Sequence, residues 1–318
     1  MIKSILSLPY QIVHSLRCLL YDWGVCQRKK LPAYTISIGN LSFGGTGKTP
    51  VTIAIAKYLN DQGLKVCVLT RGYKSKIKNY PVILSPEPGA QSPEPFIGDE
   101  AMEMFNAFKD TGIILTVDPN RYRAGEITSQ KHPIDVFVLD DGMQHLGLAR
   151  DLEIVLKNVN ESGFMREFPW AESKADHIIY TKVDEQWITD NEKSENPKKY
   201  ARFNLSLTKT LHPTESLGVL TGVADPSSLV KMLKNELAAQ GFQSKQLEKI
   251  VTRFYPDHHF FSLGEVKEVL ALGINIITTE KDLVRIPGEY RDRFVVAKLE
   301  LNFEPESLLQ DLYKGVTR

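Results

Sequence analysis

Residues 37–50, SIGNLSFGGTGKTP, decide how the first half of the chain folds. The apolar run YTISIG, which leads into them, has the length and composition of a buried β-strand, and the run after them, VTIAIAKYLNDQG, has helical spacing. A glycine-rich turn between a strand and a helix points backbone N–H groups and the positive end of the helix dipole at a bound anion. We therefore predict a phosphate-binding loop here.

The loop carries the side chains that a metal–nucleotide complex requires. Lys48 is expected to reach the β- and γ-phosphates of ATP, and the Thr49 hydroxyl is expected to ligate Mg²⁺. The general pattern GxxxxGK[ST] has glycine where this chain has Ser42, so the Gly44–Gly45 pair is expected to supply the backbone freedom. The predicted nucleotide-binding residues are Ser42, Phe43, Gly44, Gly45, Thr46, Gly47, Lys48 and Thr49.

Apolar runs of strand length alternate with helical patterns from residue 34 to residue 181. The runs include VCVLT, GIILTV, DVFVLD, LEIVLK and DHIIYT. Nearly continuous Val, Ile and Leu are typical of parallel strands that helices cover on both faces. We predict an α/β fold in which a doubly wound, mostly parallel sheet carries the phosphate loop.

A chain of 318 residues is long enough for two domains, and a second, smaller α/β series follows the polar segment DEQWITDNEKSENPKKY. Two alternating segments, YARFNLSL and FVVAKLELNF, flank this series and are expected to pair as a two-stranded connection. The predicted parts are an N-terminal helix at 1–27, a nucleotide-binding domain at 28–205, a smaller domain at 206–296, and a return strand with a terminal helix at 297–318.

The composition favours a small-molecule ligand over a polyanion. Lys plus Arg and Asp plus Glu balance at 39 each, so no broad attraction to nucleic acid is expected. Three cysteines without a CxxC pattern indicate neither a disulfide framework nor a thiolate zinc site. Nothing in the sequence indicates an oligomer, and a monomer is favoured.

The first 27 residues are the most apolar part of the chain. The uncharged stretch between Lys3 and Arg17 is shorter than the roughly 20 residues of a membrane-spanning helix, and no signal-peptide cleavage site follows it. One helical face carries Ile12, Val13, Leu16, Leu19, Leu20 and Trp23. Such a face packs on the protein's own core or lies in a membrane interface, and the spacing alone leaves both possibilities open.

Carboxylates follow a second predicted strand, as a phosphate loop with a metal requires. In DVFVLDDG, four apolar residues precede Asp140 and Asp141, which we predict to bind the metal. In FIGDE, Asp99 and Glu100 precede a helix, where they suit either a bound ligand or the helix dipole. The segment TKVD at 181–184 is similar to the guanine-binding motif of GTPases, although Met143 replaces the glycine that the GTPase metal motif requires.

These segments together resemble the tetraacyldisaccharide 4'-kinase family of Gram-negative bacteria. The matching pieces include LRCLLYDWG, IGNLSFGGTGKTP, LTRGYK, IGDE, LDDGMQHLGLARDLEIVL, MRE, PDHH and TTEKD. The resemblance implies transfer of the ATP γ-phosphate to the 4'-hydroxyl of an acylated glucosamine disaccharide 1-phosphate. It also implies a peripheral enzyme on the cytoplasmic face of the inner membrane, with the first helix at the lipid surface.

The resemblance assigns roles to further residues of this chain. Asp99 matches the family's catalytic base, His258 its partner from the second domain, and Lys48 the lysine of the phosphate loop, which completes the expected catalytic set. The positions that match polar family residues near the nucleotide or the sugar phosphate are Arg71, Tyr73, Arg121, His145, Arg166 and Glu167. Two other readings remain, a soluble GTPase or other NTPase that uses Thr181–Asp184, and a membrane-bound module that senses nucleotide without transferring phosphate.

Overall fold

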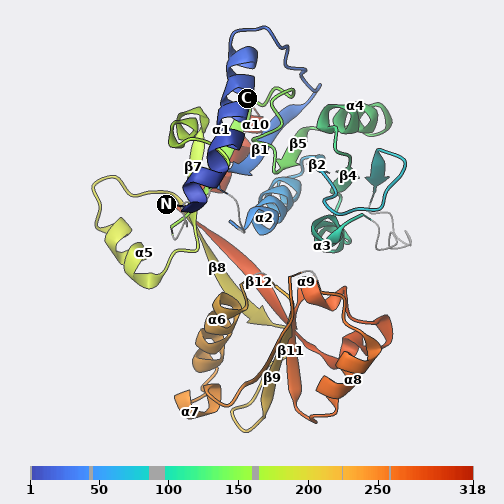
Figure 1. Ribbon diagram of the computed structural model, residues 1–318, viewed down its shortest axis with the longest axis vertical. Coiled ribbons are helices and arrows are strands. Elements are labelled where there is room, and N and C mark those ends of the chain that lie inside the picture. Colours follow the sequence, from blue (N-terminus) through green and yellow to red (C-terminus); the bar gives the residue numbers. More distant parts are fainter. Residues whose placement is uncertain are drawn as a thin grey trace. The chain divides into compact units, whose positions relative to one another are not determined.

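The computed structural model describes residues 2–42, 46–85, 97–159, 165–223, 225–257 and 259–317. The chain divides into two compact units, Met1–Arg202 with Leu301–Arg318, and Phe203–Glu300. Strands β8 (Tyr200–Leu207) and β12 (Val295–Glu304) are neighbours, and each passes from one unit into the other (Figure 1). The expected α/β fold with a mostly parallel sheet and a two-stranded connection is confirmed.

The strands of the first unit follow the order β7-β6-β1-β5-β2-β4-β3. Their bounds are β1 Tyr34–Asn40, β2 Val66–Thr70, β3 Val82–Leu84, β4 Ile114–Val117, β5 Val136–Asp140, β6 Leu152–Asn158 and β7 His177–Thr181. Strand β3 pairs antiparallel with β4, and the other pairs are parallel. Ile38 of β1 lies opposite Asp140 of β5, so the carboxyl ends of these two strands meet at one edge.

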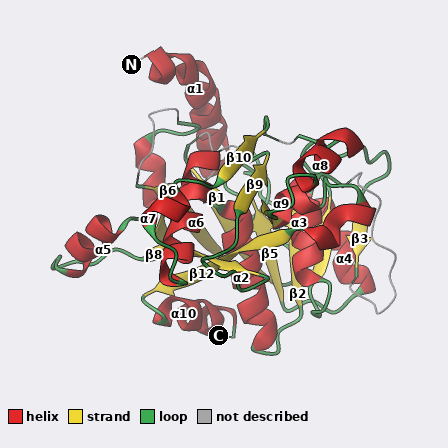
Figure 2. Ribbon diagram, turned by 90° about the horizontal axis from the view of Figure 1, so that it is seen from below, coloured by secondary structure: helices red, strands yellow, loops and turns green. Residues whose placement is uncertain are grey.

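Helices cover both faces of this part of the sheet. The helices of this unit are α1 (Ile2–Asp22), α2 (Lys48–Asp61), α3 (Asp99–Phe108), α4 (Arg121–Lys131), the 3-10 helix η1 (Pro169–Lys174), α5 (Glu185–Glu192) and α10 (Ser307–Val316). Cys67 and Leu69 of β2 pack in one buried cluster with Ala124 of α4. Helix α2 contacts β1, β2 and β5 and packs beside α3 and α10 (Figure 2). Burial on both faces explains why these strands are almost wholly apolar.

The second unit places β9 (Leu217–Thr221) between β10 (Val251–Phe254) and β11 (Asn275–Thr279), with β12 beyond β11. Its helices are α6 (Pro226–Ala239), α7 (Ser244–Leu247), α8 (Leu263–Leu270), α9 (Glu280–Leu283) and the 3-10 helix η2 (Gly288–Arg293). Val219 and Ile277 pack with α6, whereas their neighbours Leu220 and Ile276 pack with α8. The alternation shows that this smaller sheet also has a core on each face.

Helix α1 is amphipathic in an unusual sense, because its apolar face is the exposed one. Ile12, Val13, Leu16, Leu19 and Leu20 are between 39% and 59% exposed. Among the α1 residues whose burial the structure describes, the buried ones are Gln11, His14 and Cys18. Of the two possibilities that the sequence leaves open, the structure excludes packing of the apolar face on the unit's own core. No described helix has the length and hydropathy of a membrane span.

Two helices of this unit form where the sequence has no strong apolar pattern. Helix α4 lacks a strong apolar pattern and packs through small residues, since a Cβ on Gly125 would come within 2.5 Å of Leu31. Helix α5 lies in the segment expected to be a polar surface stretch, and Asp184 begins it by accepting a hydrogen bond from the Trp187 amide at 2.9 Å.

Candidate active site

The phosphate loop leaves β1 at Asn40 and enters α2 at Lys48. Phe43, Gly44 and Gly45 lie outside the described residues. Gly47 caps α2 with a φ of 80°, a left-handed conformation that suits glycine. Ser42 instead forms an antiparallel bridge with Met165, and its carbonyl accepts a hydrogen bond from Asn40 Nδ2 at 3.0 Å. This extended pairing does not need glycine, which explains why serine fits there.

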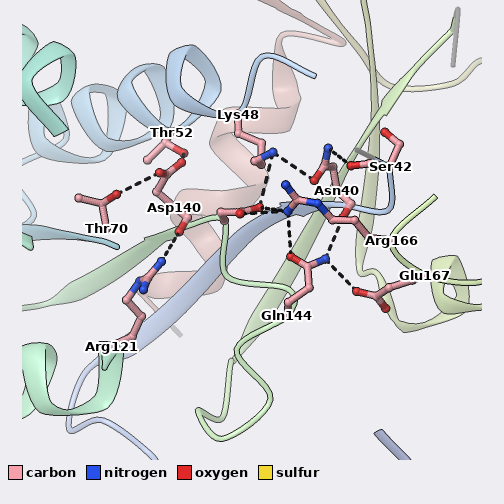
Figure 3. Close-up of polar contacts among 11 residues, drawn as sticks. Asn40, Ser42, Lys48, Thr52, Thr70, Arg121, Asp140, Gln144, Arg166 and Glu167 are labelled. Carbon is pink, nitrogen blue, oxygen red and sulfur yellow. Dashed lines mark hydrogen bonds and ion pairs between the residues drawn. The ribbon is translucent and has the colours of Figure 1, made fainter. Parts of the chain in front are cut away.

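Lys48 is held between two side chains at the edge of the sheet. Its Nζ donates to Asn40 Oδ1 at 3.1 Å (Figure 3). The same nitrogen lies 3.5 Å from Asp141 Oδ1. The lysine side chain is only 15% exposed. Asn40 and Asp141 therefore fix the ammonium at the mouth of the phosphate loop before any ligand binds.

Asp140 ends β5 as a buried carboxylate. Thr52 Oγ1 donates to its Oδ1 at 3.3 Å, and Thr70 Oγ1 donates to its Oδ2 at 3.2 Å (Figure 3). Burial, followed by the charges of Glu100 and Asp141, raises the pKa of Asp140 to about 6. A carboxylate whose charge is this costly gains from a bound cation, which fits the predicted role as a metal ligand.

Asp141 adopts a left-handed backbone conformation with a φ of 51°. Arg166 Nη1 donates to both of its carboxylate oxygens at 3.0 Å. Burial acts to raise the pKa of Asp141, but the charges of Lys48 and Arg166 outweigh it and hold the pKa below its ordinary value. Asp140 and Asp141 are thus adjacent carboxyl groups with pKa values displaced in opposite directions, as befits different roles.

Gln144 links this edge of the sheet to the segment that carries Arg166 and Glu167. Its Nε2 donates to Glu167 Oε1 at 2.9 Å and to the Asn40 carbonyl at 3.0 Å (Figure 3). Its Oε1 lies 3.4 Å from Arg166 Nη1. The amide therefore brings the two sequence-predicted residues 166 and 167 to the carboxyl ends of β1 and β5.

An arginine supports the loop that carries Gln144. Arg150 Nη1 donates to the carbonyls of Gly142, Met143 and His145 at 3.3, 3.4 and 3.4 Å. Its Nε pairs with Glu153 Oε2 at 2.8 Å, and this glutamate is buried on β6. The loop between DDGMQH and RDLEIV is thus held in place by Arg150, which is itself paired with Glu153 on the following strand β6.

His145 lies on the same loop and is uncharged at neutral pH. Burial, followed by the positive charges of Arg121 and Arg150, lowers the pKa of His145 to about 4. A neutral imidazole offers one N–H donor and one acceptor nitrogen. His145 therefore suits a hydrogen bond to a sugar or nucleotide better than a salt bridge to a phosphate.

Asp99 opens α3 next to the loop that follows β2. Gly98 has a φ of 92°, and a Cβ there would overlap the carbonyl oxygen of Tyr73. The close approach brings Tyr73 beside the Asp99 turn. Asp99 and Glu100 are half-buried, whereas Arg71 and Tyr73 are exposed. The predicted residues Asp99, Arg71 and Tyr73 therefore lie on two adjoining segments, the start of α3 and the loop after β2.

Like Glu167, Arg121 is a buried member of the residues predicted to lie near the ligand. Its guanidinium donates to the carbonyls of Asp118, Pro119 and Asp140. Burial lowers the pKa of Arg121 to about 10, so it remains charged at neutral pH. Because its guanidinium binds backbone carbonyls, Arg121 supports the carboxyl end of β5.

The predicted histidine of the second unit, His258, lies outside the described residues. Its neighbour His259 lies 3.1 Å from Glu265 Oε1, and its ring stacks on Tyr255 with centroids 4.6 Å apart. These contacts give His259 a structural role.

The residues that resemble a guanine-binding motif have structural partners. Thr181 Oγ1 donates to the carbonyl of Thr46 at 3.0 Å, so it supports the phosphate loop. Asp184 caps α5 through the amide of Trp187. The four-residue match is therefore explained without guanine.

The arrangement fits Mg²⁺ held together with a nucleotide. Among the residues that the structure describes, no three His, Cys, Asp or Glu side chains gather as an independent metal site. Mg²⁺ at a phosphate loop takes one or two carboxylates and a hydroxyl, together with phosphate oxygens and water. The buried carboxyl group of Asp140 and the hydroxyl of Thr49, which is 9% exposed, are the donors that such a site uses.

Comparison with known proteins decides between the remaining alternatives. A family model described as tetraacyldisaccharide-1-P 4'-kinase matches residues 1–317. The chain belongs to this family. The tetraacyldisaccharide 4'-kinase of Pelobacter propionicus is 30% identical, over 98% of this chain and 90% of the relative. That of Actinobacillus succinogenes is 29% identical, over 98% of this chain and 94% of the relative.

A solved structure is also similar over the full length. It is a crystal structure of LpxK from Aquifex aeolicus in complex with ATP, with 28% identity and a TM-score of 0.77. The alignment covers 100% of this chain and 99% of that one. The similarity extends through both units of this 4'-kinase family member.

Several residues of this 4'-kinase site were not predicted from the sequence. Asn40, Gln144, Arg150 and Glu153 lie inside segments that the sequence singled out, but no role was assigned to them. Each acts on another side chain or on backbone carbonyls, so its role appears only when the strands are aligned.

Proposed function

We propose that this chain transfers the γ-phosphate of ATP to the 4'-hydroxyl of tetraacyldisaccharide 1-phosphate, which yields lipid IVA in lipid A biosynthesis. The observation that carries the proposal is the full-length family match on a chain whose Lys48, Asp140 and Asp141 meet at one sheet edge. Transfer of a phosphoryl group depends mainly on alignment and charge neutralisation, which such a grouping of fixed charges supplies.

The nucleotide would bind along the phosphate loop. Thr46 and Gly47 can offer backbone N–H groups, Lys48 can neutralise the β- and γ-phosphates, and the α2 dipole favours the anion. Thr49, Asp140 and Asp141 would hold Mg²⁺, which supplies positive charge to the transferring phosphoryl group. The prior fixation of Lys48 by Asn40 and Asp141 reduces the ordering that ATP binding requires.

The acceptor hydroxyl requires a proton acceptor, and we assign Asp99 to this role with His258 as its partner. Asp99 stands at the start of α3, whose neighbour Glu100 acts electrostatically on Asp140. A carboxylate there can take the hydroxyl proton as the oxygen attacks phosphorus, and an imidazole can orient the carboxylate or relay the proton. The assignment of His258 rests on the family resemblance and includes closure of the predicted 28–205 and 206–296 domains over the substrate.

The polar residues around this edge would bind the acceptor. Arg71 and Tyr73 are exposed beside the Asp99 turn, and Arg166 faces Asp141. Glu167 and His145 offer hydrogen bonds to sugar hydroxyls. For Arg121 we propose indirect action, because its guanidinium holds the carbonyl of Asp140.

The acyl chains of the acceptor place the reaction at a membrane surface, which we propose is the cytoplasmic face of the inner membrane. The exposed apolar face of α1 supports this location, since such a face loses contact with water when it enters a bilayer interface. We propose that the chain acts as a monomer and as a peripheral protein.

Transfer of label to lipid tests this function. Purified protein is incubated with γ-labelled ATP, Mg²⁺ and tetraacyldisaccharide 1-phosphate in detergent, and the lipids are separated. The proposal predicts label in the lipid that excess unlabelled ATP abolishes and an equal excess of GTP reduces much less. A folded wild-type protein that leaves the lipid unlabelled contradicts it.

A further inference from the structure

The buried face of α1, which carries Gln11 and His14, contacts segment 165–174. Gln11 Nε2 donates to the Met165 carbonyl at 2.9 Å, and His14 Nδ1 lies 3.8 Å from Glu167 Oε2. Near the C-terminal end of α1, Asp22 Oδ2 pairs with Lys174 Nζ at 2.8 Å. Residues 11 and 22 are about 16 Å apart along a helix. Helix α1 therefore contacts both ends of segment 165–174.

The 3-10 helix η1 within this segment has one anchored side and one open side. Ala171 is buried in a cluster with Leu41 and Met143. Trp170, its neighbour, is 50% exposed. Because the buried Ala171 fixes the backbone of η1, the exposed Trp170 side chain is carried by an ordered element.

The surroundings of Trp170 match a lipid headgroup region. Lys174 Nζ lies 5.7 Å from the Trp170 ring centroid, and Trp23, just past the end of α1, is 73% exposed. Arg17 is exposed on α1, and both Arg17 and Lys174 act to lower the pKa of His14, after burial. Tryptophan rings and snorkelling cations are the residues that proteins place at the boundary between hydrocarbon and anionic headgroups.

We propose that η1, through Trp170, is a second lipid-contacting element, which adjoins α1 and faces the same phospholipid bilayer. The inference rests on the proposed location of α1 at a membrane surface. Trp170 stands four residues after Arg166, whose guanidinium contacts Asp141. One short segment therefore extends from the bilayer surface to the proposed phosphoryl-transfer site. The headgroup of a lipid acceptor would reach this site while its acyl chains remain in the membrane.

The three tryptophans of the chain provide the test, because each lies in a different setting. Trp187 packs between Tyr180 and Tyr200, at centroid distances of 5.4 and 5.6 Å, and serves as the internal control. Full-length proteins that keep one tryptophan, with phenylalanine at the other two positions, are mixed with phosphatidylcholine–phosphatidylglycerol vesicles. The acyl chains are brominated in half of the samples, and fluorescence quenching is measured.

The proposal predicts strong quenching of Trp23 and Trp170 and little quenching of Trp187. Quenching of Trp23 without Trp170 would overturn the role of η1 and leave the interfacial role of α1 standing. Absence of quenching at both positions would overturn both. The two failures are therefore distinguishable.

A substitution provides a second measurement. Trp170→Ser is expected to weaken vesicle binding by about tenfold, because the variant lacks the exposed half of the tryptophan side chain that would move from water into the bilayer. Leu272→Ser, at a position 43% exposed in the second unit, is the matched control and should bind vesicles like wild type. Thermal unfolding confirms that both variants fold. Equal vesicle binding by the two folded variants would overturn the proposal.

Discussion

Arg150 Nε lies 2.8 Å from Glu153 Oε2, and this pair holds the loop that follows strand β5. Glu153 also accepts a hydrogen bond from Ser37 Oγ at 2.7 Å. A Cβ on Gly142 would lie 2.5 Å from the same hydroxyl, so the loop backbone rests directly on β1. Asp141 therefore keeps its left-handed conformation between a fixed strand and a fixed loop.

The buried glutamate predicts a specific pH dependence of stability. Burial raises the pKa of Glu153 to about 7. A carboxyl group whose pKa is higher in the folded protein binds more protons there, so stability falls as pH rises from the unfolded pKa to the folded one. Relative to Glu153→Gln, the wild-type free energy of unfolding should fall by about 2 kcal/mol between pH 5 and pH 8.

Denaturant unfolding of both proteins across this pH range measures the difference. The comparison with the amide variant cancels the titration of Asp140, which is common to both proteins. A constant difference from pH 5 to pH 8 would show that Glu153 keeps an ordinary pKa.

Lys48 should matter more to catalysis than His258. Charge neutralisation on the phosphates dominates a loose transition state, so Lys48→Ala is expected to lower kcat by about a thousandfold. Loss of a partner to a general base costs about ten- to a hundredfold, which we expect for His258→Ala. Lys131→Ala, an exposed lysine at the end of α4, is the control. Steady-state kinetics rank the variants, and a greater loss for His258→Ala contradicts the ranking.

Arg166 should keep Asp141 ionised at acid pH. Its charge helps to keep the pKa of Asp141 below its ordinary value, so Arg166→Gln should raise that pKa. NMR titration of the Asp141 carboxyl carbon, assigned with Asp141→Asn, measures this pKa. Arg202→Gln, in an exposed ion pair with Glu185, should leave the pKa of Asp141 in place. An equal Asp141 pKa in Arg166→Gln and wild type would refute this role.

Two glycines with positive φ allow the loss of stability caused by a steric clash to be separated from the loss caused by backbone conformation. Gly98 has a φ of 92° and meets the Tyr73 carbonyl, whereas Gly63 has a φ of 87° with nothing within 4 Å of an added Cβ. Gly63→Ala should cost about 1 kcal/mol of stability from its conformation alone. Gly98→Ala should cost roughly 1–3 kcal/mol more. It should also lower kcat, since the substitution moves Asp99.

Calorimetric unfolding and steady-state kinetics of both alanine variants check this prediction. Equal loss of stability in the two variants would mean that the approach of Gly98 to Tyr73 is not tight in solution.

The sheet and the phosphate loop could be predicted because their determinants are local. Runs such as DVFVLDD combine continuous burial with a charged end, and Asp140 ends β5 as expected. Gly47 and Lys48 likewise follow from a strand, a glycine-rich turn and a helix in sequence. Patterns of this kind depend on neighbours along the chain and not on distant contacts.

The supporting contacts could not be predicted because they join residues far apart in sequence. Gln144 reaches the Asn40 carbonyl, and Gln11 reaches the Met165 carbonyl, only after the strands and α1 are in place. The apolar pattern of α1 was visible, but which face it buries depends on the polar contacts that Gln11 and His14 make with Met165 and Glu167. Helix α4 was missed because it packs through Gly125 and not through an apolar stripe.

The position of the new phosphate tests the central claim most directly. The lipid product of a preparative reaction with ATP and Mg²⁺ is examined by phosphorus–proton correlation NMR. We predict two phosphomonoester resonances, one at the original 1-position and one correlated with the 4' proton of the distal sugar. A lipid that retains a single phosphate while inorganic phosphate accumulates would contradict the claim, because it would identify the chain as an ATP hydrolase.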